Sequence, residues 1–277
     1  MNSFDLGGDG PPLHFLHANG YPPGCYKPLF ELLKSEYRVF GMHLRPLWKD
    51  AKPQEIQSWH PFSDDLLRFF SDHKPDSIIG VGHSIGGIVT LRAALRDPGK
   101  FRALILIDPV LFVPSILILR KLTRALGLGD RTLPLIAGAK KRRRHFDDLD
   151  IAFKRYRKHT VFRYMSDQSL WSYIEGITKP SKHDGYHLVY SPEWEAQIYR
   201  TGMQDFDIWR NLPKLELPTL FIRGVETNTF LVNAARLVKK KQPKVKIEAL
   251  ERSTHLLPLE RPQEVFKIMQ SFLKEVL

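Results

Sequence analysis

The chain has 277 residues, 43% of them hydrophobic and 26% charged, and a formal net charge of +12 at pH 7. This composition excludes a disordered chain, and the length suits one α/β domain with an insertion, or at most two domains. The single cysteine, Cys25, excludes an internal disulfide framework and favours a reducing, cytoplasmic setting. Residues 1–8 lack the basic start and apolar core of a signal peptide. The longest apolar run, residues 103–119, contains Asp108 and two prolines, so it does not predict a membrane-spanning helix.

Residues 1–110 alternate short apolar strands with helices. We expect strands at residues 13–17, 37–42, 77–83 and 101–107, with room for one short strand before the first. Helical patterns cover residues 28–34 and 58–73, and a helix from Ile85 stops at Asp97-Pro98-Gly99. Strands that are apolar on both faces and alternate with helices indicate a parallel sheet covered on both sides.

The alternation breaks over residues 111–211, where the pattern is helical and irregular, with many aromatic and basic residues. It resumes with strands at 218–224 and 245–250 and helices at 230–240 and 262–276. The sequence therefore predicts an α/β fold with a mostly parallel, doubly wound sheet. Its core would be residues 1–110 and 212–277, with a helical cap of residues 111–211 inserted between them.

The stretch 77–89 has the most specific motif, Gly82-His83-Ser84-Ile85-Gly86, between an apolar strand and a helix. This is the G-x-S-x-G nucleophile elbow. The sharp turn brings the residues two before and two after the serine close together, so only small residues fit there. Ser84 is therefore predicted to be a nucleophile at the N-terminus of a helix.

A serine nucleophile needs a general base, and the base needs a third group that orients it. His255 lies in the loop after the last strand, at the same edge of the sheet as Ser84. Asp108 and Glu226 both follow strands that end at this edge, and either keeps the chain order serine, acid, histidine. Both acids remain candidates from position alone.

The tetrahedral intermediate of acyl transfer needs two N–H donors for its oxyanion. The backbone N–H of Ile85 is one candidate, and that of Asn19, in the loop after the first apolar strand, is the other. Small residues in that loop let the backbone approach a substrate closely. We therefore expect His17, Gly20 and His83 to lie against the substrate.

Together these features resemble the α/β-hydrolase family, in particular serine hydrolases of the esterase type with a helical cap. The resemblance implies that Ser84 is the nucleophile, that His255 is the base and that the insertion is a lid. Such proteins often have His-Gly where this chain has His17-Ala18, and an aspartate three residues after the glycine of the late strand, where this chain has Thr227. Some members carry the acid after the earlier strand, so the resemblance favours Asp108 over Glu226. The matching segments are 17–20, 82–87, 104–109, 220–224 and 254–262.

The cap contains a basic run, residues 140–144, followed by a second at 154–159. These runs favour a solvated face over a site for anionic lipid head groups, an acidic substrate or nucleic acid, and weak contact of residues 140–144 with an anionic membrane is the alternative that stays open. No nucleic-acid-binding module is visible, so no nucleic-acid partner is expected. The sequence has no phosphate-binding loop, metal-ligand cluster or dinucleotide fingerprint, so no metal or other cofactor is expected.

The sequence thus predicts a serine hydrolase that cleaves a carboxylic ester or related acyl bond through an acyl-enzyme. The substrate would be small to medium and partly apolar. Hydrolysis of a thioester, lactone, amide or carbon–carbon bond uses the same apparatus and is an alternative. A second alternative is a non-catalytic ligand-binding protein, because a fold alone does not prove activity. A third is a basic protein bound to a membrane or nucleic acid. The oligomeric state cannot be predicted.

Overall fold

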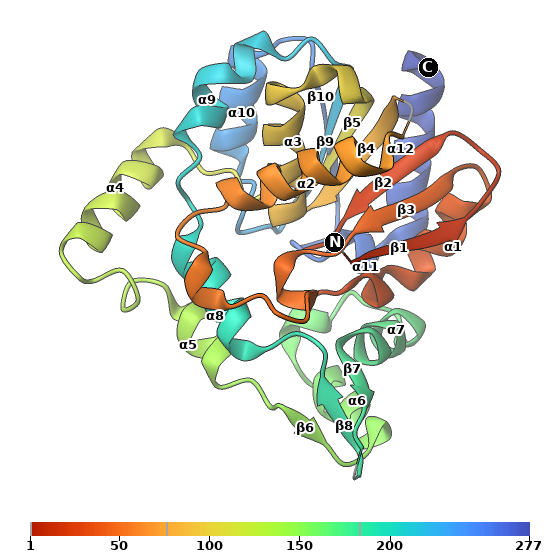
Figure 1. Cartoon of the computed structure of the whole chain (residues 1–277), viewed down its shortest axis with the longest axis vertical. Coiled ribbons are helices and arrows are strands. Elements are labelled where there is room, and N and C mark those ends of the chain that lie inside the picture. Colours follow the sequence, from red (N-terminus) through yellow and green to blue (C-terminus); the bar gives the residue numbers. More distant parts are fainter. Residues whose placement is uncertain (1, 76, 183) are drawn as a thin grey trace.

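A seven-stranded sheet forms the centre of the computed structural model, which describes residues 2–75, 77–182 and 184–277 (Figure 1). The strand order is β1-β3-β2-β4-β5-β9-β10. Strand β1 is antiparallel to β3, and every other neighbouring pair is parallel. The strands are β1 (Ser3–Gly7), β2 (Pro12–Leu16), β3 (Arg38–Met42), β4 (Ile78–His83), β5 (Phe101–Ile107), β9 (Thr219–Gly224) and β10 (Lys246–Leu250). The predicted mostly parallel sheet is confirmed, with one short strand before β2.

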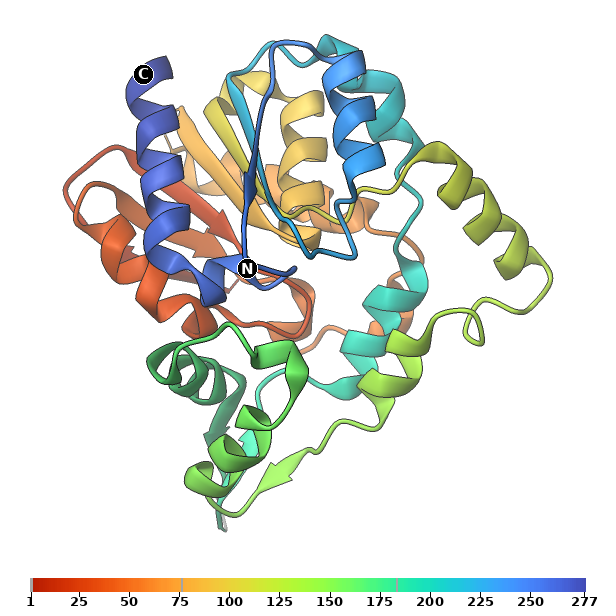
Figure 2. The same cartoon turned by 180° about the vertical axis from the view of Figure 1, so that it is seen from behind.

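Helices cover both faces of this sheet (Figures 1 and 2). One face packs against α2 (His60–His73), α3 (Ile85–Arg96), α9 (Phe206–Asn211) and α10 (Val232–Lys241). The other packs against α1 (Lys27–Lys34), α11 (Leu257–Glu260) and α12 (Pro262–Val276). Along β5, Leu104 and Leu106 belong to the first core, whereas Ala103, Ile105 and Ile107 belong to the second. This alternation is why β5 is apolar on both faces.

The segment between β5 and β9 lies below the sheet and beside it in Figure 1. Its helices are α4 (Pro114–Ala125), α5 (Pro134–Lys140), α6 (Leu149–Arg157), α7 (Asp167–Ile177), α8 (Pro192–Thr201) and α9, the last of which packs on the sheet. It also contains a three-stranded antiparallel sheet of β6 (His145–Phe146), β8 (Tyr186–Leu188) and β7 (Thr178–Pro180). The sequence predicts a helical and irregular segment here and does not indicate these strands. Strands of two or three residues are too short to show an alternating pattern.

Helix α7 is anchored to the core through a close backbone approach. A Cβ atom on Gly24 would lie 2.9 Å from Gly176 Cα, and one on Gly176 would lie 2.4 Å from Cys25 N. Gly24 lies in the short helix Pro23–Tyr26, near the end of the segment between β2 and α1. The two glycines therefore let the cap pack directly on the loop beside the predicted site. In the part of the chain that the structure describes, no helix is long and apolar enough to cross a membrane.

Candidate active site

The turn between β4 and α3 gives Ser84 an unusual backbone. Its φ is 59° and its ψ is −121°, a strained combination that side-chain-bearing residues rarely adopt. A Cβ atom on Gly82 would lie 2.3 Å from Gly86 O, and one on Gly86 would lie 2.1 Å from Leu16 O. Both glycines are thus required by backbone packing. The turn holds Ser84 at the start of α3, where free backbone N–H groups favour negative charge.

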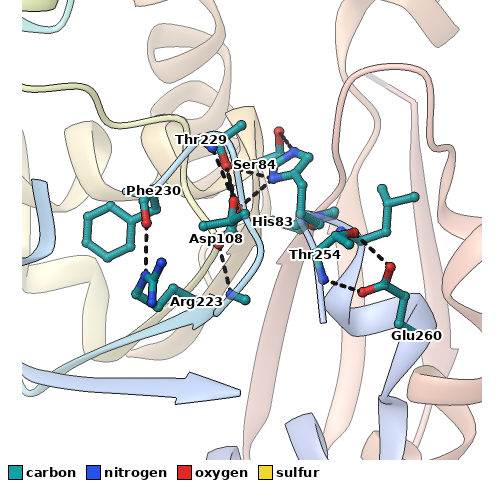
Figure 3. Close-up of polar contacts among 12 residues, drawn as sticks. His83, Ser84, Asp108, Arg223, Thr229, Phe230, Thr254 and Glu260 are labelled. Carbon is teal, nitrogen blue, oxygen red and sulfur yellow. Dashed lines mark hydrogen bonds and ion pairs between the residues drawn. The ribbon is translucent and has the colours of Figure 1, made fainter. Parts of the chain in front are cut away.

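Three side chains from separate loops meet at this turn, and Figure 3 labels two of them, Ser84 and Asp108. His255 Nε2 lies 2.9 Å from Ser84 Oγ. On the other side of the ring, His255 Nδ1 lies 2.7 Å from Asp108 Oδ2. Asp108 is fully buried and Ser84 is 5% exposed. The structure therefore brings Ser84, His255 and Asp108 into one hydrogen-bonded chain.

The Asp108 carboxylate accepts hydrogen bonds from the strand and loop around β9. Its Oδ1 accepts the Gly224 N–H at 3.1 Å, and its Oδ2 accepts the Thr227 hydroxyl at 2.5 Å. The Thr229 hydroxyl also donates to Oδ2. Thr227 stands where the resemblance would place an aspartate, and here it supports the acid instead. Sequence reasoning missed Thr229, because a loop threonine carries no distinctive motif.

Glu226, the other candidate acid, lies away from His255. Its side chain is about 40% exposed and forms a 2.5 Å ion pair with Arg163. It also accepts a hydrogen bond from the Tyr164 hydroxyl at 2.7 Å. These two donors lower the pKa of Glu226, the tyrosine more than the arginine. Asp108, and not Glu226, is therefore the carboxylate that contacts His255.

The loop that carries His255 is fixed by a buried glutamate. Glu260 in α11 accepts the Thr254 backbone N–H at 2.7 Å and the Thr254 hydroxyl at 2.7 Å (Figure 3). Burial raises the pKa of Glu260. Its two bonds hold the residue directly before His255, so they restrict where the imidazole can lie. The sequence contained Glu260 in a matching segment but did not indicate this role.

The loop after β2 lies against the first turn of α3. A Cβ atom on Gly86 would come 2.8 Å from His17 O. In the part of the chain that the structure describes, neither the Asn19 N–H nor the Ile85 N–H donates a hydrogen bond to the protein. The Asn19 side chain points to the cap, where it bonds Glu195 O at 3.1 Å and the Tyr190 hydroxyl at 2.9 Å.

His83 belongs to a buried network rather than to an open surface. Its Nδ1 accepts the Tyr26 hydroxyl at 2.8 Å, and Tyr26 in turn accepts the Ala18 N–H at 3.0 Å. Its Nε2 donates to the backbone carbonyl of His255 at 2.8 Å. Burial lowers the pKa of His83 well below its usual range, so the ring is neutral. This network links the loop after β2, the elbow and the His255 loop.

The His17 ring is also used within the protein. Its Nδ1 donates to Ala18 O at 2.9 Å, and its Nε2 accepts the Leu44 N–H at 3.2 Å. Burial lowers the pKa of His17 to about 3. Both nitrogens of His17 and of His83 are occupied and both residues are fully buried. These two side chains therefore hold loops together, and contact of either residue with a substrate stays a prediction.

Gly20 lies against the cap, with a φ of 75°. A Cβ atom there would approach Glu195 Cδ at 3.0 Å and Arg142 Nη1 at 3.1 Å. Arg142 belongs to the basic run 140–144, but its side chain is only 12% exposed and pairs with Glu195 at 2.6 Å. Arg142 also donates to the Tyr173 hydroxyl at 2.9 Å. This arginine therefore contributes to the interior of the cap and not to a charged surface.

Two surface cavities of the described chain lie apart from Ser84. One of about 530 Å³ is lined by residues including Arg120, Arg124 and Arg200. Another of about 540 Å³ is lined by residues including Asp148 and Trp171. Among the residues that the structure describes, no group of three histidine, cysteine or acidic side chains is arranged to hold a metal ion.

Comparisons with known proteins agree with this fold. A type I acyl-CoA thioesterase of Penicillium brevicompactum is 30% identical over 111 residues, which are 34% of this chain and 25% of that protein. A pimeloyl-(acyl-carrier protein) methyl ester esterase of Legionella pneumophila is 29% identical over 106 residues, which are 36% of this chain and 39% of that protein. The matches thus span well under half of these relatives.

The crystal structure of E-2-(acetamidomethylene)succinate hydrolase superposes with a TM-score of 0.81 at 18% identity and covers 99% of this chain and 94% of that one. The model of the alpha/beta hydrolase family matches residues 15–268, and the chain therefore belongs to that family.

Proposed function

We propose that this protein is a serine hydrolase that cleaves a carboxylic ester or thioester through an acyl-enzyme. The observation that carries the proposal is the continuous chain from Ser84 Oγ through His255 to Asp108, with distances of 2.9 Å and 2.7 Å. A hydroxyl bonded to an imidazole, which is itself oriented by a buried carboxylate, is the arrangement that activates serine for attack on a carbonyl.

In the first half of the reaction, Ser84 Oγ attacks the carbonyl carbon while His255 Nε2 takes its proton. Asp108 accepts the Nδ1–H and keeps Nε2 free to receive that proton. The N–H groups of Ile85 and Asn19 bind the oxyanion of the tetrahedral intermediate. Collapse of this intermediate breaks the bond to the leaving alcohol or thiol, which takes the proton from His255. The acyl group remains on Ser84.

In the second half, a water molecule attacks the acyl-enzyme. His255 removes a proton from this water as its oxygen bonds to the carbonyl carbon. The intermediate collapses, the proton returns to Ser84 Oγ, and the carboxylic acid leaves. No redox step occurs, and the only co-reactant is water.

We name an ester and a thioester as the leading substrates because of the activities of the relatives. One is a thioesterase and the other a methyl ester esterase, both acting on acyl groups. Lactone, amide and carbon–carbon bond hydrolysis remain alternatives on the same residues, and a ligand-binding protein without turnover remains the alternative of another class. Rates on an ester and a thioester with the same acyl chain would decide between the two leading substrates.

A small fluorophosphonate probe tests the nucleophile directly. We expect intact mass spectrometry to find one adduct on the wild-type protein and none on Ser84→Ala. The control is Ser71→Ala on α2, where the hydroxyl only bonds the Leu67 carbonyl, and this variant should be labelled like the wild type. Labelling of Ser84→Ala, or no labelling of the wild type, would count against the proposal and favour the ligand-binding alternative.

A further inference from the structure

Helix α4 stands away from the sheet in both views (Figures 1 and 2), held to the molecule along one side. On this inner side Leu117 is fully buried. Arg120 Nη1 donates to Gly129 O at 2.5 Å, and Arg124 Nη2 donates to Arg200 O at 2.5 Å. Arg124 also donates to Gly202 O. These bonds tie α4 to the loop after it and to the end of α8, so its position is well defined.

The opposite side of α4 is apolar and uncovered. We call it the outer face of α4 and define it as Ile118, Leu119, Leu122 and Leu126, which are 51%, 59%, 56% and 72% exposed. Their spacing places them on one stripe of a helix. Leu128 in the following loop and Leu135 in α5 are also exposed, at 39% and 50%. Scattered surface leucines are ordinary, but several on one helix stripe mark an interaction surface.

The chain segment that contains this face is basic. Residues 114–144 contain nine lysines and arginines and one acidic residue, Asp130. Asp130 is already paired with Arg200 at 2.6 Å. Five of the basic residues turn inward or pair. Arg120 and Arg124 bond carbonyls. Arg142 pairs with Glu195, Arg144 with Glu193, and Lys140 lies 4.0 Å from Asp130. Lys121, Arg131, Lys141 and Arg143 remain exposed, without an ion pair among the described residues.

We propose that the outer face of α4 docks on an anionic lipid surface. The four apolar side chains would enter the boundary between head groups and acyl chains, with Lys121 and Arg131 against lipid phosphates. A second copy of this chain fits less well. A symmetric contact between two outer faces would bring the same cations of both copies together, with no carboxylate between them. An anionic membrane offers an apolar layer for the four side chains and negative phosphates for the neighbouring cations.

Vesicle co-sedimentation tests the proposal with the full chain. We expect the wild-type protein to bind vesicles of phosphatidylcholine with phosphatidylserine at least about tenfold more tightly than vesicles of phosphatidylcholine alone, and added salt to weaken binding. Leu119→Gln/Leu122→Gln should bind the anionic vesicles at least about tenfold more weakly, because glutamine keeps the helix but removes the apolar contact. Lys121→Gln/Arg131→Gln should reduce the preference for phosphatidylserine.

The matched control is Ile151→Gln/Val232→Gln, which changes two apolar residues that are 58% and 47% exposed on α6 and α10. This variant should bind vesicles like the wild type. Equal binding to both kinds of vesicle, or no binding to either, would overturn the proposal. So would a wild-type dimer that Leu119→Gln/Leu122→Gln dissociates, because the occupant would then be a second copy. The proposal does not depend on turnover, and Ser84→Ala should bind vesicles normally.

Discussion

Asp108 combines two properties that make it a sensitive position. Its backbone φ is 40°, a conformation that aspartate and asparagine tolerate better than most residues. Its carboxylate contacts only donors: the Gly224 N–H, the Thr227 and Thr229 hydroxyls, and His255 Nδ1. An asparagine would keep the backbone but place an amide N–H among these donors.

We therefore expect Asp108→Asn to lower kcat by a factor of about 10³ or more, because the imidazole would turn its proton toward Ser84. Glu226→Gln is the matched control. Its carboxylate bonds Arg163 and Tyr164 instead of His255, so kcat should stay within about twofold. Steady-state rates of both variants on one activated ester provide the measurement. Equal losses in the two variants would contradict the assignment of the acid.

Tyr26 is the central residue of the buried network between Ala18 and His83. Tyr26→Phe would leave the Ala18 N–H and His83 Nδ1 without partners, and a buried unpaired group costs about 1–3 kcal/mol. Because His83 bonds the His255 carbonyl, the change should also displace the base. We expect kcat to fall about tenfold while KM changes little.

The control for this variant is Tyr37→Phe, the same chemical change directly before β3, in a tyrosine that packs in the core with α1 and α12. It should leave kcat unchanged. If Tyr26→Phe lowers the free energy of unfolding but not kcat, the network is structural and Tyr26 does not position the reacting groups. Denaturant unfolding and steady-state kinetics on the same samples separate these outcomes.

Among the elements, the elbow depends on positions that have no side chain. Gly86→Ala would place a methyl group 2.1 Å from the Leu16 carbonyl oxygen, at the end of β2. The backbone of β2 cannot move aside as a flexible side chain can. We therefore expect the free energy of unfolding to decrease by about 3 kcal/mol or more, or the protein not to fold. Denaturant unfolding or soluble yield would measure it.

Gly138→Ala is the matched control for the elbow. Gly138 lies within α5, and a Cβ atom there would meet no atom within 4 Å. Alanine in an open helical position should raise the free energy of unfolding by about 0.5–1 kcal/mol. A stable Gly86→Ala variant would mean that β2 and α3 can separate, and the packing described for the elbow would then be wrong.

The elements of the core were predictable because each has its own local pattern. The residues of β4 are mostly apolar, which predicts a buried strand. Gly82 and Gly86 are the small residues that the sharp turn into a helix requires, so β4, the turn and α3 could be predicted from the sequence. The cap was harder. Its strands β6 to β8 have two or three residues each, and their pairing depends on tertiary contacts rather than on periodicity.

In the site, too, residues that belong to a local motif could be predicted, whereas contacts between distant parts of the chain could not. Ser84 and the loop position of His255 are visible in the sequence, but the choice between Asp108 and Glu226 depends on side-chain direction. The Tyr26–His83 bond joins residues 57 positions apart. The Thr229–Asp108 bond joins residues 121 positions apart. Neither pair has a spacing that a single sequence could reveal.

At the scale of the whole molecule, three fully buried histidines link stability to pH. Burial lowers the pKa of His14 and of His17 from 6.5 to about 3, and that of His83 well below 6.5. The unfolded chain therefore binds protons below about pH 6.5 that the folded chain does not. The free energy of unfolding should therefore decrease as the pH is lowered below about 6.5, by up to about 1.4 kcal/mol per pH unit for each histidine. Glu260 and Asp205, whose pKa values burial raises, oppose this trend at lower pH.

Urea unfolding at a series of pH values from about 7 to about 5.5 would measure this slope. His14→Gln should reduce it, because glutamine can still accept the Met42 N–H that His14 Nε2 accepts at 3.0 Å but does not titrate. His159→Gln changes an exposed histidine of the cap and should leave the slope unchanged. If His14→Gln kept the full wild-type slope, protonation of the buried rings would not be what destabilises the protein in acid.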